Sequence, residues 1–342
     1  MYAARSIRFS YLILPLLAAA LACNLGAPLP QTATPSPVVL PTVEAPPVST
    51  PTFEGAVPVE LPAKRADRAG DVDSSANAHR QLVSGGDVFV HGLYERPFNS
   101  DPMDKYFAYL DIVDTQGFLD DTWGYASITL QNTDESGALA GEYAIELDVD
   151  RNGRGDWLIR VSQPSSTAWS PQGVKAWSNS DGDIGGVAIM TADSKPRGGN
   201  GYERLVFDEG KGDLKDGAWA RVSPDDPKIV ELAFKLEMIG NATAFAMGAW
   251  AGSEIDPAMF DYHDQMTHAQ AGSPNPGYEV YPLKDMAEID NTCRLAVGFV
   301  PTGKEPGLCQ TVAQEQAEAG GGACVPRGCS PNSLLCVPVT CP

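Results

Sequence analysis

The residues whose types and spacing best suit chemistry lie at positions 148–156, where oxygen-bearing side chains recur around a glycine. The segment reads Asp-Val-Asp-Arg-Asn-Gly-Arg-Gly-Asp. Calcium takes about six to eight oxygen ligands, which side chains at the first, third, fifth and ninth loop positions and a carbonyl at the seventh can largely supply. We therefore predict a calcium site formed by the side chains of Asp148, Asp150, Asn152 and Asp156 and the backbone carbonyl of Arg154.

This loop departs from the EF-hand pattern. The twelfth position is Ile159 instead of a bidentate glutamate, and the flanking segments resemble strands instead of helices. The alternative is a plain hairpin turn at Asn152-Gly153 whose acids keep an exposed turn soluble. A plain hairpin does not require three aspartates at this spacing, which favours calcium. Acidic loops at 179–183 and 120–121 either complete a metal site or are solvated turns.

The cysteines form a second constellation near the C-terminus. Apart from Cys23 there are six, at positions 293, 309, 324, 329, 336 and 341. An even number of clustered cysteines in an exported chain indicates a disulfide framework, for which about 15 connectivities are possible. The zinc alternative would require Cys-x-x-Cys pairs, which this segment lacks. We predict that Cys293, Cys309, Cys324, Cys329, Cys336 and Cys341 form disulfides.

Common catalytic signatures are absent from the sequence. It contains no Gly-x-Ser-x-Gly, His-Glu-x-x-His or Gly-x-Gly-x-x-Gly. Asp261, His263, Asp264 and His268 form a local cluster, but their spacing favours a loop contact over a metal site. A glycosidase needs only two carboxylates that meet in space, so a hydrolase remains an alternative for a chain with 44 acidic residues.

The N-terminus has the features of an export signal. Residues 1–22 contain Arg5 and Arg8, no acid, and an apolar run shorter than the roughly 20 residues that span a bilayer. The Ala-Leu-Ala-Cys segment at 20–23 resembles a bacterial lipobox, with alanine where leucine is usual. This resemblance implies lipidation of Cys23 and attachment to the cell envelope, facing outside the cytoplasm. The alternative is an ordinary secretory signal with an incidental cysteine.

The elements that must position these residues follow from composition. Residues 23–64 are rich in Pro and Thr, which predicts a disordered, lipid-anchored linker with polyproline II character. Residues 65–290 alternate short apolar runs with turn residues, which predicts an antiparallel, jelly-roll-like β-sandwich. Residues 291–342 would form a small tail stabilised by disulfides. The fold class predicted is all-β.

Alternation is clearest at 143–149, where Tyr143, Ile145 and Leu147 alternate with mostly polar residues, as in a half-buried strand. We expect the six tryptophans to be core or sheet-face anchors. The predicted strands are 87–93, 106–113, 125–131, 143–149, 157–161, 174–177, 187–191, 204–207, 218–222, 229–236 and 245–250.

The region from Asp71-Val-Asp73-Ser-Ser to Ala249-Trp250-Ala251 resembles the secreted β-sandwiches of the DOMON type and the family 9 carbohydrate-binding modules. The resemblance is architectural and covers about 200 residues through strand spacing. It implies binding of a sugar or of a redox cofactor such as haem. The Met and His residues have no spacing that assigns axial haem ligands.

The charge balance narrows the choice of partners. There are 24 Lys and Arg against 44 Asp and Glu, a net charge of −20, which disfavours binding to nucleic acid. The sequence therefore predicts a surface lipoprotein whose main domain is a non-catalytic binding module for carbohydrate or an envelope component. The alternatives are a secreted polysaccharide hydrolase and a structural envelope protein without a small ligand.

Overall fold

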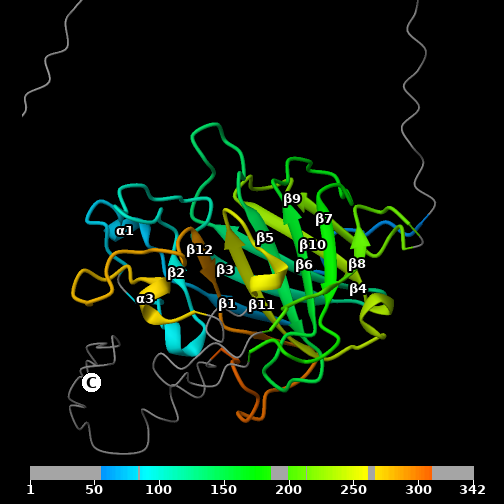
Figure 1. Cartoon of the computed structure of the whole chain (residues 1–342). Helices are drawn as coiled ribbons and strands as arrows, with labels where there is room; N and C mark the ends of the chain where they lie inside the picture. Colours follow the sequence, from blue (N-terminus) through cyan, green and yellow to red (C-terminus); the bar gives the residue numbers. More distant parts are fainter. Residues whose placement is uncertain (1–54, 84, 186–198, 213, 261–265, 310–342) are drawn as a thin grey trace, which may run out of the picture. The chain divides into compact units, whose positions relative to one another are not determined.

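The computed structural model describes residues 55–309 except 84, 186–198, 213 and 261–265. The chain divides into two units, residues 1–52 and 53–342, and all described residues belong to the second unit. That unit consists mainly of two antiparallel sheets that pack face to face (Figure 1). The predicted all-β sandwich is confirmed.

The smaller sheet has five strands in the spatial order β1-β3-β4-β10-β9. Every neighbouring pair in it is antiparallel. Its strands are β1 (Asp67–Gly70), β3 (Ile112–Leu119), β4 (Trp123–Leu130), β9 (Ala218–Val222) and β10 (Ile229–Lys235).

The larger sheet has eight strands, in the order β2-β12-β11-β5-β6-β7-β8, with β13 also paired to β11. Its strands are β2 (Glu95–Arg96), β5 (Glu142–Asp148), β6 (Trp157–Ser162), β7 (Val174–Ser178), β8 (Arg204–Asp208), β11 (Phe245–Gly252), β12 (Ile289–Asn291) and β13 (Leu295–Val297). The short helices are α1 (Ser75–Ala78), η1 (Phe89–His91), η2 (Leu236–Ile239), η3 (Pro257–Met259) and α3 (His268–Ala271).

The core lies between the sheets and follows the two-residue period of strands. On β5 the side chains of Tyr143, Ile145 and Leu147 enter this core, as predicted from their alternation. The polar face of the same strand is not exposed, however, because Glu146 and Asp148 are both buried. The expectation of a half-buried strand was therefore wrong for β5, since side chains from elsewhere cover its polar face as well.

The outer face of the smaller sheet is covered by part of the segment predicted to be a linker. Leu61 and Trp169 pack on the buried aromatic side chains of this face. Trp169 Nε1 donates to the carbonyl of Val59 at 2.9 Å, and Arg221 pairs with Glu60 at 2.6 Å. Residues 59–61 thus contact the sandwich directly.

The predicted strands from 125–131 to 245–250 correspond to β4 through β11, except that 187–191 lies outside the described residues. Two predictions were wrong. Segment 87–93 contains the 3-10 helix η1, which ends at Gly92 with a left-handed φ of 67°. Segment 106–113 becomes a strand only at Ile112. The four short strands β1, β2, β12 and β13 were missed.

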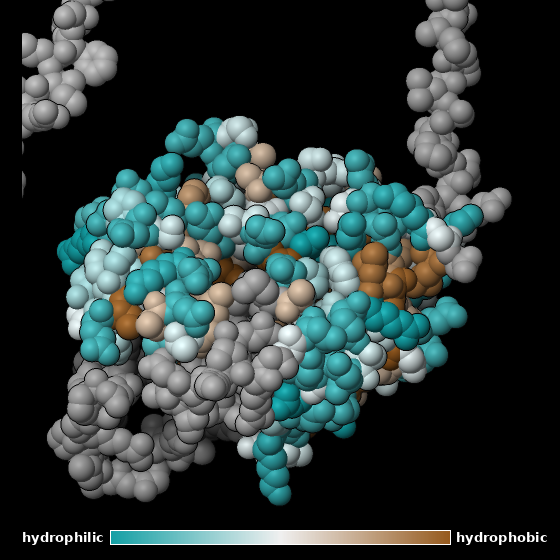
Figure 2. All heavy atoms as spheres, in the orientation of Figure 1, coloured by the Kyte–Doolittle hydropathy of each residue, from teal (hydrophilic) through white to brown (hydrophobic). Residues whose placement is uncertain are grey.

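The face shown in Figure 2 is largely hydrophilic, with hydrophobic residues gathered over β8, an edge strand on which Leu205 is 47% exposed. Within the described residues, no helix has the length and apolar content needed to cross a bilayer.

Candidate metal centres

The acidic loop (residues 148–156) joins β5 to β6, so two neighbouring strands fix its ends. Asp148 is the last residue of β5, and Asp156 directly precedes β6. Leu147 pairs with Trp157 in the ladder, and Asp156 N donates to Leu147 O at 2.8 Å. The strands therefore hold the first and last acids of the loop close together.

Backbone donors orient the carboxylates of the acidic loop. Asp148 accepts hydrogen bonds from Asn152 N at 3.0 Å and Gly153 N at 2.7 Å. Gly153 has a φ of 93°, which glycine adopts without steric cost. Asp148, Asp150 and Asp156 each place one oxygen within 4.8 Å of the others. Ligands on opposite sides of one calcium ion are about 5 Å apart, so one ion can reach all three oxygens.

The other two predicted ligands lie in the same loop. Asn152 Oδ1 accepts a hydrogen bond from Arg154 N at 2.7 Å, and the side chain of Arg154 donates to the carbonyl of Ile184. The structure thus brings the three predicted aspartates together, with Asn152 and Arg154 between them in the chain. The identity of an ion, and a bond from the Arg154 carbonyl, remain predictions.

A buried arginine lies beneath the acidic loop. Arg294 Nη1 is 3.4 Å from Asp148 Oδ2, and its Nη2 is 3.2 Å from Glu146 Oε2. Tyr202 donates its hydroxyl to Glu146 at 2.9 Å. Burial raises the pKa of Asp148 to about 6, and Arg294 opposes the rise. Burial also raises the pKa of Asp156. Arg294 therefore supplies one positive charge on the inner side of the loop.

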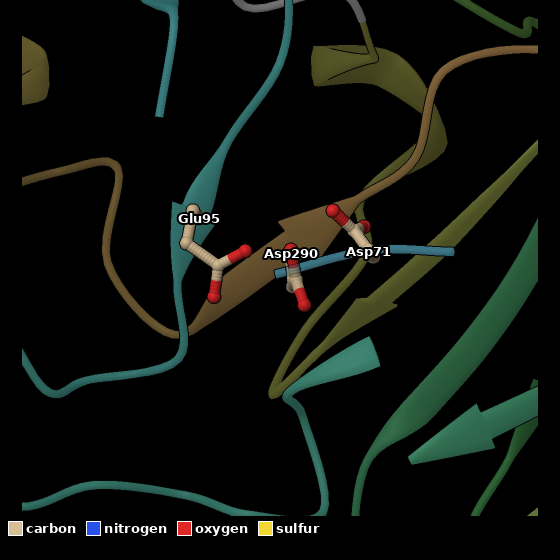
Figure 3. Close-up of side chains that lie close together, drawn as sticks. All are labelled: Asp71, Glu95 and Asp290. Atoms are coloured by element: carbon tan, nitrogen blue, oxygen red, sulfur yellow. The ribbon is translucent and has the colours of Figure 1, made fainter. Parts of the chain in front are cut away.

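A second group of acids, which the sequence analysis did not single out, lies where β2 pairs with β12. We call Asp71, Glu95, Asp111 and Asp290 the carboxylate cluster. Glu95 of β2 lies directly opposite Asp290 of β12, and Asp71 follows β1. Figure 3 shows the side chains of Glu95, Asp290 and Asp71 converging from these three segments. One oxygen from each of these three lies within 4.8 Å of the others. Asp111 precedes β3, which pairs with β1.

Each carboxylate of the cluster has one oxygen held by a donor. Asp71 accepts from Val72 N at 2.8 Å, and Asp290 accepts from Ile112 N at 2.6 Å. Ser74 serves the other two acids.

The hydroxyl of Ser74 donates to Glu95 Oε1 at 2.6 Å, and the backbone N–H of Ser74 donates to Asp111 Oδ2 at 3.1 Å. Tyr106 also donates its hydroxyl to Asp111 Oδ2. Each remaining oxygen is buried and lacks a hydrogen-bond partner within the described part of the chain. These oxygens are Asp71 Oδ2, Glu95 Oε2, Asp111 Oδ1 and Asp290 Oδ1.

Burial is the largest cause of the unusual acidities in this cluster. It raises the pKa of Asp71 and of Asp111 to about 7, and that of Glu95 to about 10. The pKa of Asp290 is raised well above its ordinary value, because burial acts together with repulsion from the other three acids. No Lys or Arg of the described residues forms an ion pair with these four acids.

The remaining acidic loops have structural partners. Asp120 accepts hydrogen bonds from Thr122 N and Trp123 N, both at 2.7 Å, and from the hydroxyl of Tyr125 at 2.9 Å. In the 179–183 loop, Asp183 accepts from Asn200 N at 2.7 Å. The 120–121 loop is thus a hydrogen-bonded turn, whereas in the 179–183 loop Asp183 Oδ1 is buried and has no hydrogen-bond partner among the described residues.

Two of the six predicted disulfide cysteines lie within the described residues. Cys293 and Cys309 form a disulfide across 16 positions. The predicted partners Cys324, Cys329, Cys336 and Cys341, and the predicted lipidation site Cys23, lie outside the described residues. Arg294 follows Cys293 directly, and its backbone bonds to Gly307 O and Cys309 N at 2.9 Å each. The disulfide thus holds the segment that presents Arg294 to the acidic loop.

The resemblance to DOMON domains and family 9 carbohydrate-binding modules implies a haem or a sugar as ligand. Met238 and Met247 are buried in the core between the sheets, so neither faces a haem site. Asp261, His263 and Asp264 lie outside the described residues, while His268 stacks on Phe89 at 4.7 Å.

All six tryptophans are described, and none is fully exposed. Trp123, Trp219 and Trp250 are buried, as expected for core or sheet-face anchors. Among the described aromatic side chains, only Tyr278 is a large exposed group, at 42%. A platform of several exposed Trp or Tyr, which a sugar-binding face would favour, is thus missing from this part of the protein.

Comparison with known proteins adds no assignment: no protein-family model, no curated protein and no solved structure matches this chain.

Proposed function

We propose that this protein is a non-catalytic, calcium-binding module held at the cell envelope through Cys23. The observation that supports calcium binding is the convergence of Asp148, Asp150 and Asp156 in one strand-connecting loop. Three carboxylates so close together repel one another, and a divalent cation removes that repulsion. The ion would hold the β5–β6 connection in one conformation, as a rigid part of a surface that binds carbohydrate or another envelope component.

The oxygen donors of the acidic loop suit calcium better than a transition metal. The predicted ligands are carboxylate, amide and carbonyl oxygens, whereas zinc and copper sites commonly use His or Cys. The carbohydrate part of the proposal rests on the architectural resemblance alone. A glycan array probed with residues 55–342 in calcium tests it.

The calcium proposal is tested by replacing an exposed ligand. Asp150→Ala should bind one calcium ion fewer than the wild type, measured by atomic spectroscopy after dialysis. At calcium concentrations about 100 times the Kd, the lost site should remove about 2.7 kcal/mol of calcium-dependent stability.

Asp225→Ala is the matched control, because it removes one exposed acid from a different loop. It should bind as many ions as the wild type. If Asp150→Ala also binds as many ions as the wild type, the acidic loop is a plain hairpin.

The envelope location is tested separately. The full chain with Cys23→Ser should leave the membrane fraction and appear in the soluble fraction of the same cells, because the acceptor of the lipid is gone. Cys309→Ser, which removes a sulfur with no expected role in lipidation, is the control and should stay with the membranes. Retention of the Cys23→Ser protein in membranes would refute the lipid anchor.

A further inference from the structure

We propose that the carboxylate cluster is a second calcium site, separate from the acidic loop, which joins segments from opposite ends of the described chain. Asp71, Glu95 and Asp290 would supply the ligand oxygens that lie within 4.8 Å of one another. Asp111, directly before β3, adds a fourth negative charge beside them. This inference does not rest on the proposed function, because no residue is shared between the two sites.

Burying these carboxylates without partners is energetically costly. Glu95, Asp111 and Asp290 are fully buried, and each has an oxygen without a hydrogen-bond partner among the described residues. An ionised carboxylate that loses its water and gains no partner is strongly unfavourable. Either protons or a cation must neutralise such a group, and one cation could contact an oxygen of Asp71, Glu95 and Asp290 at once.

The hydrogen-bond donors around the cluster are arranged as they are around metal ligands. One oxygen of every carboxylate is already held by an N–H or O–H group, while the other oxygen has no hydrogen-bond partner in the part of the chain that the structure describes. Outer partners of this kind fix the orientation of metal-binding side chains. Ser74 is central to the arrangement, because its hydroxyl and backbone N–H hold Glu95 and Asp111 at once.

The chemistry of the group selects the ion. The donors are carboxylate oxygens without a sulfur or imidazole ligand in the group, which indicates a hard cation. Magnesium retains several waters and demands short octahedral bonds, whereas calcium accepts irregular cages of oxygens at about 2.3–2.6 Å. A buried site built from several carboxylates therefore fits calcium.

The carboxylate cluster and the acidic loop should differ in their affinity for calcium. Arg294 provides the loop with an internal positive charge, which competes with a bound cation. No arginine or lysine of the described residues pairs with the cluster. We therefore expect the cluster to hold its calcium more tightly than the loop does.

The test uses Glu95→Gln, which keeps the shape of the side chain and removes one charge. In calcium, this variant should bind one ion fewer than the wild type, and the affinity of the tighter site should fall at least about 100-fold, since even outer partners of metal ligands are worth about 10- to 100-fold. In chelator it should melt at a higher temperature than the wild type, because folding no longer requires an ionised carboxylate to be neutralised at this buried position. Asp290→Asn should behave in the same way.

Glu231→Gln is the matched control. Glu231 is a buried acid like those of the cluster, but it pairs with Arg221 at 2.5 Å. Its replacement should lower the melting temperature with and without calcium and leave the number of bound ions unchanged.

Two results would overturn the second site. One is that Glu95→Gln and Asp290→Asn bind as many calcium ions as the wild type, which would mean that protons neutralise the cluster. The other is that Asp150→Ala binds no calcium, since the cluster should still hold its ion when the loop site is lost. If instead Asp150→Ala keeps every ion and Glu95→Gln loses one, the proposal for the loop fails and the cluster site stands.

Discussion

Gly155 shows how closely the acidic loop is packed on its buried floor. A Cβ atom at this position would overlap the hydroxyl of Tyr202 and Oε1 of Glu146. These two groups form the hydrogen bond that, together with Arg294, supports Asp148 from below. The backbone can approach this network only because residue 155 has no side chain.

Gly155→Ala should therefore destabilise the protein by about 1–3 kcal/mol, as overpacking of a buried position does. It should also weaken calcium binding by the acidic loop, because the shift reaches Asp148 through Glu146 and Arg294. Urea denaturation and calcium titration measure the two effects.

Gly70→Ala is the control, because nothing lies within 4 Å of a Cβ placed there. It should change stability by no more than about 0.5 kcal/mol. Equal effects of the two substitutions would show that the loop is not packed against Tyr202 and Glu146 in solution.

The two candidate metal centres differ in how far the sequence could predict them. The acidic loop is local, since its ligands fall within nine consecutive positions. The carboxylate cluster combines residues from four distant segments, so no spacing rule reveals it. One signal was present: Asp111 interrupts the apolar run Leu110-Asp111-Ile112-Val113. An acid inside such a run is either a turn residue or a buried group that needs a partner.

Four of the long strands were predictable because their side chains alternate over enough residues to mark two faces. β3, which also has eight residues, was not, because Asp-Thr-Gln-Gly at 114–117 interrupts its apolar alternation. β4, β5, β10 and β11 have seven or eight residues each, and all four lie within predicted positions to within a few residues. β2 and β12 have two and three residues, which is too short for a period to appear. Their existence depends on the partner strand, and therefore on tertiary contacts. The position of the carboxylate cluster follows from this pair and was hidden for the same reason.

The errors at 87–93 and 106–113 have a related cause. Both segments contain apolar and aromatic residues, many of them only half-buried, that pack outside a continuous strand ladder up to Ile112. Phe89 of η1 packs beside Tyr94 and the guanidinium of Arg96. Tyr106 reaches Asp111 with its hydroxyl. Hydrophobic residues show that a segment is buried, but without a sustained period they do not show which element it forms.

For the molecule as a whole, the carboxyls with raised pKa values make stability depend on pH. Burial raises the pKa of Asp71 and Asp111 to about 7, and that of Glu95 to about 10. The folded, metal-free protein then binds more protons than the unfolded chain. The stability that these carboxyls contribute is complete below their ordinary pKa values and is lost as the pH rises through the folded values.

We therefore expect the free energy of unfolding in chelator to decrease as the pH rises from about 5 to about 9. Calcium should oppose the decrease, because it binds the deprotonated carboxylates. Urea denaturation at several pH values, with calcium and with chelator, measures both trends.

Glu95→Gln provides the comparison, since it removes the group whose pKa is raised to about 10. Its stability in chelator should fall less steeply than that of the wild type above about pH 7. Identical slopes for the two proteins would contradict the burial of an ionisable Glu95.

The pairing of β2 with β12 joins segments that are far apart in the sequence, which bears on the order in which the chain folds. Hydrogen bonds of β12 join residues far apart in the sequence: Asp290 to Ile112 across 178 positions, and Asn291 to Gly92 across 199. Closing such long loops costs conformational entropy before any contact repays it, so distant pairings form late. The hairpins β3–β4, β5–β6 and β9–β10 can form as soon as their own residues are available. The carboxylates of the cluster would stay apart and hydrated, and so would not repel one another, until almost the entire sandwich has been synthesised. In an exported protein, they would stay apart until almost all of it has been translocated. The cation would then bind in the last step of folding. Only a chain that folds in a compartment rich in that ion would complete the carboxylate cluster with its ion bound.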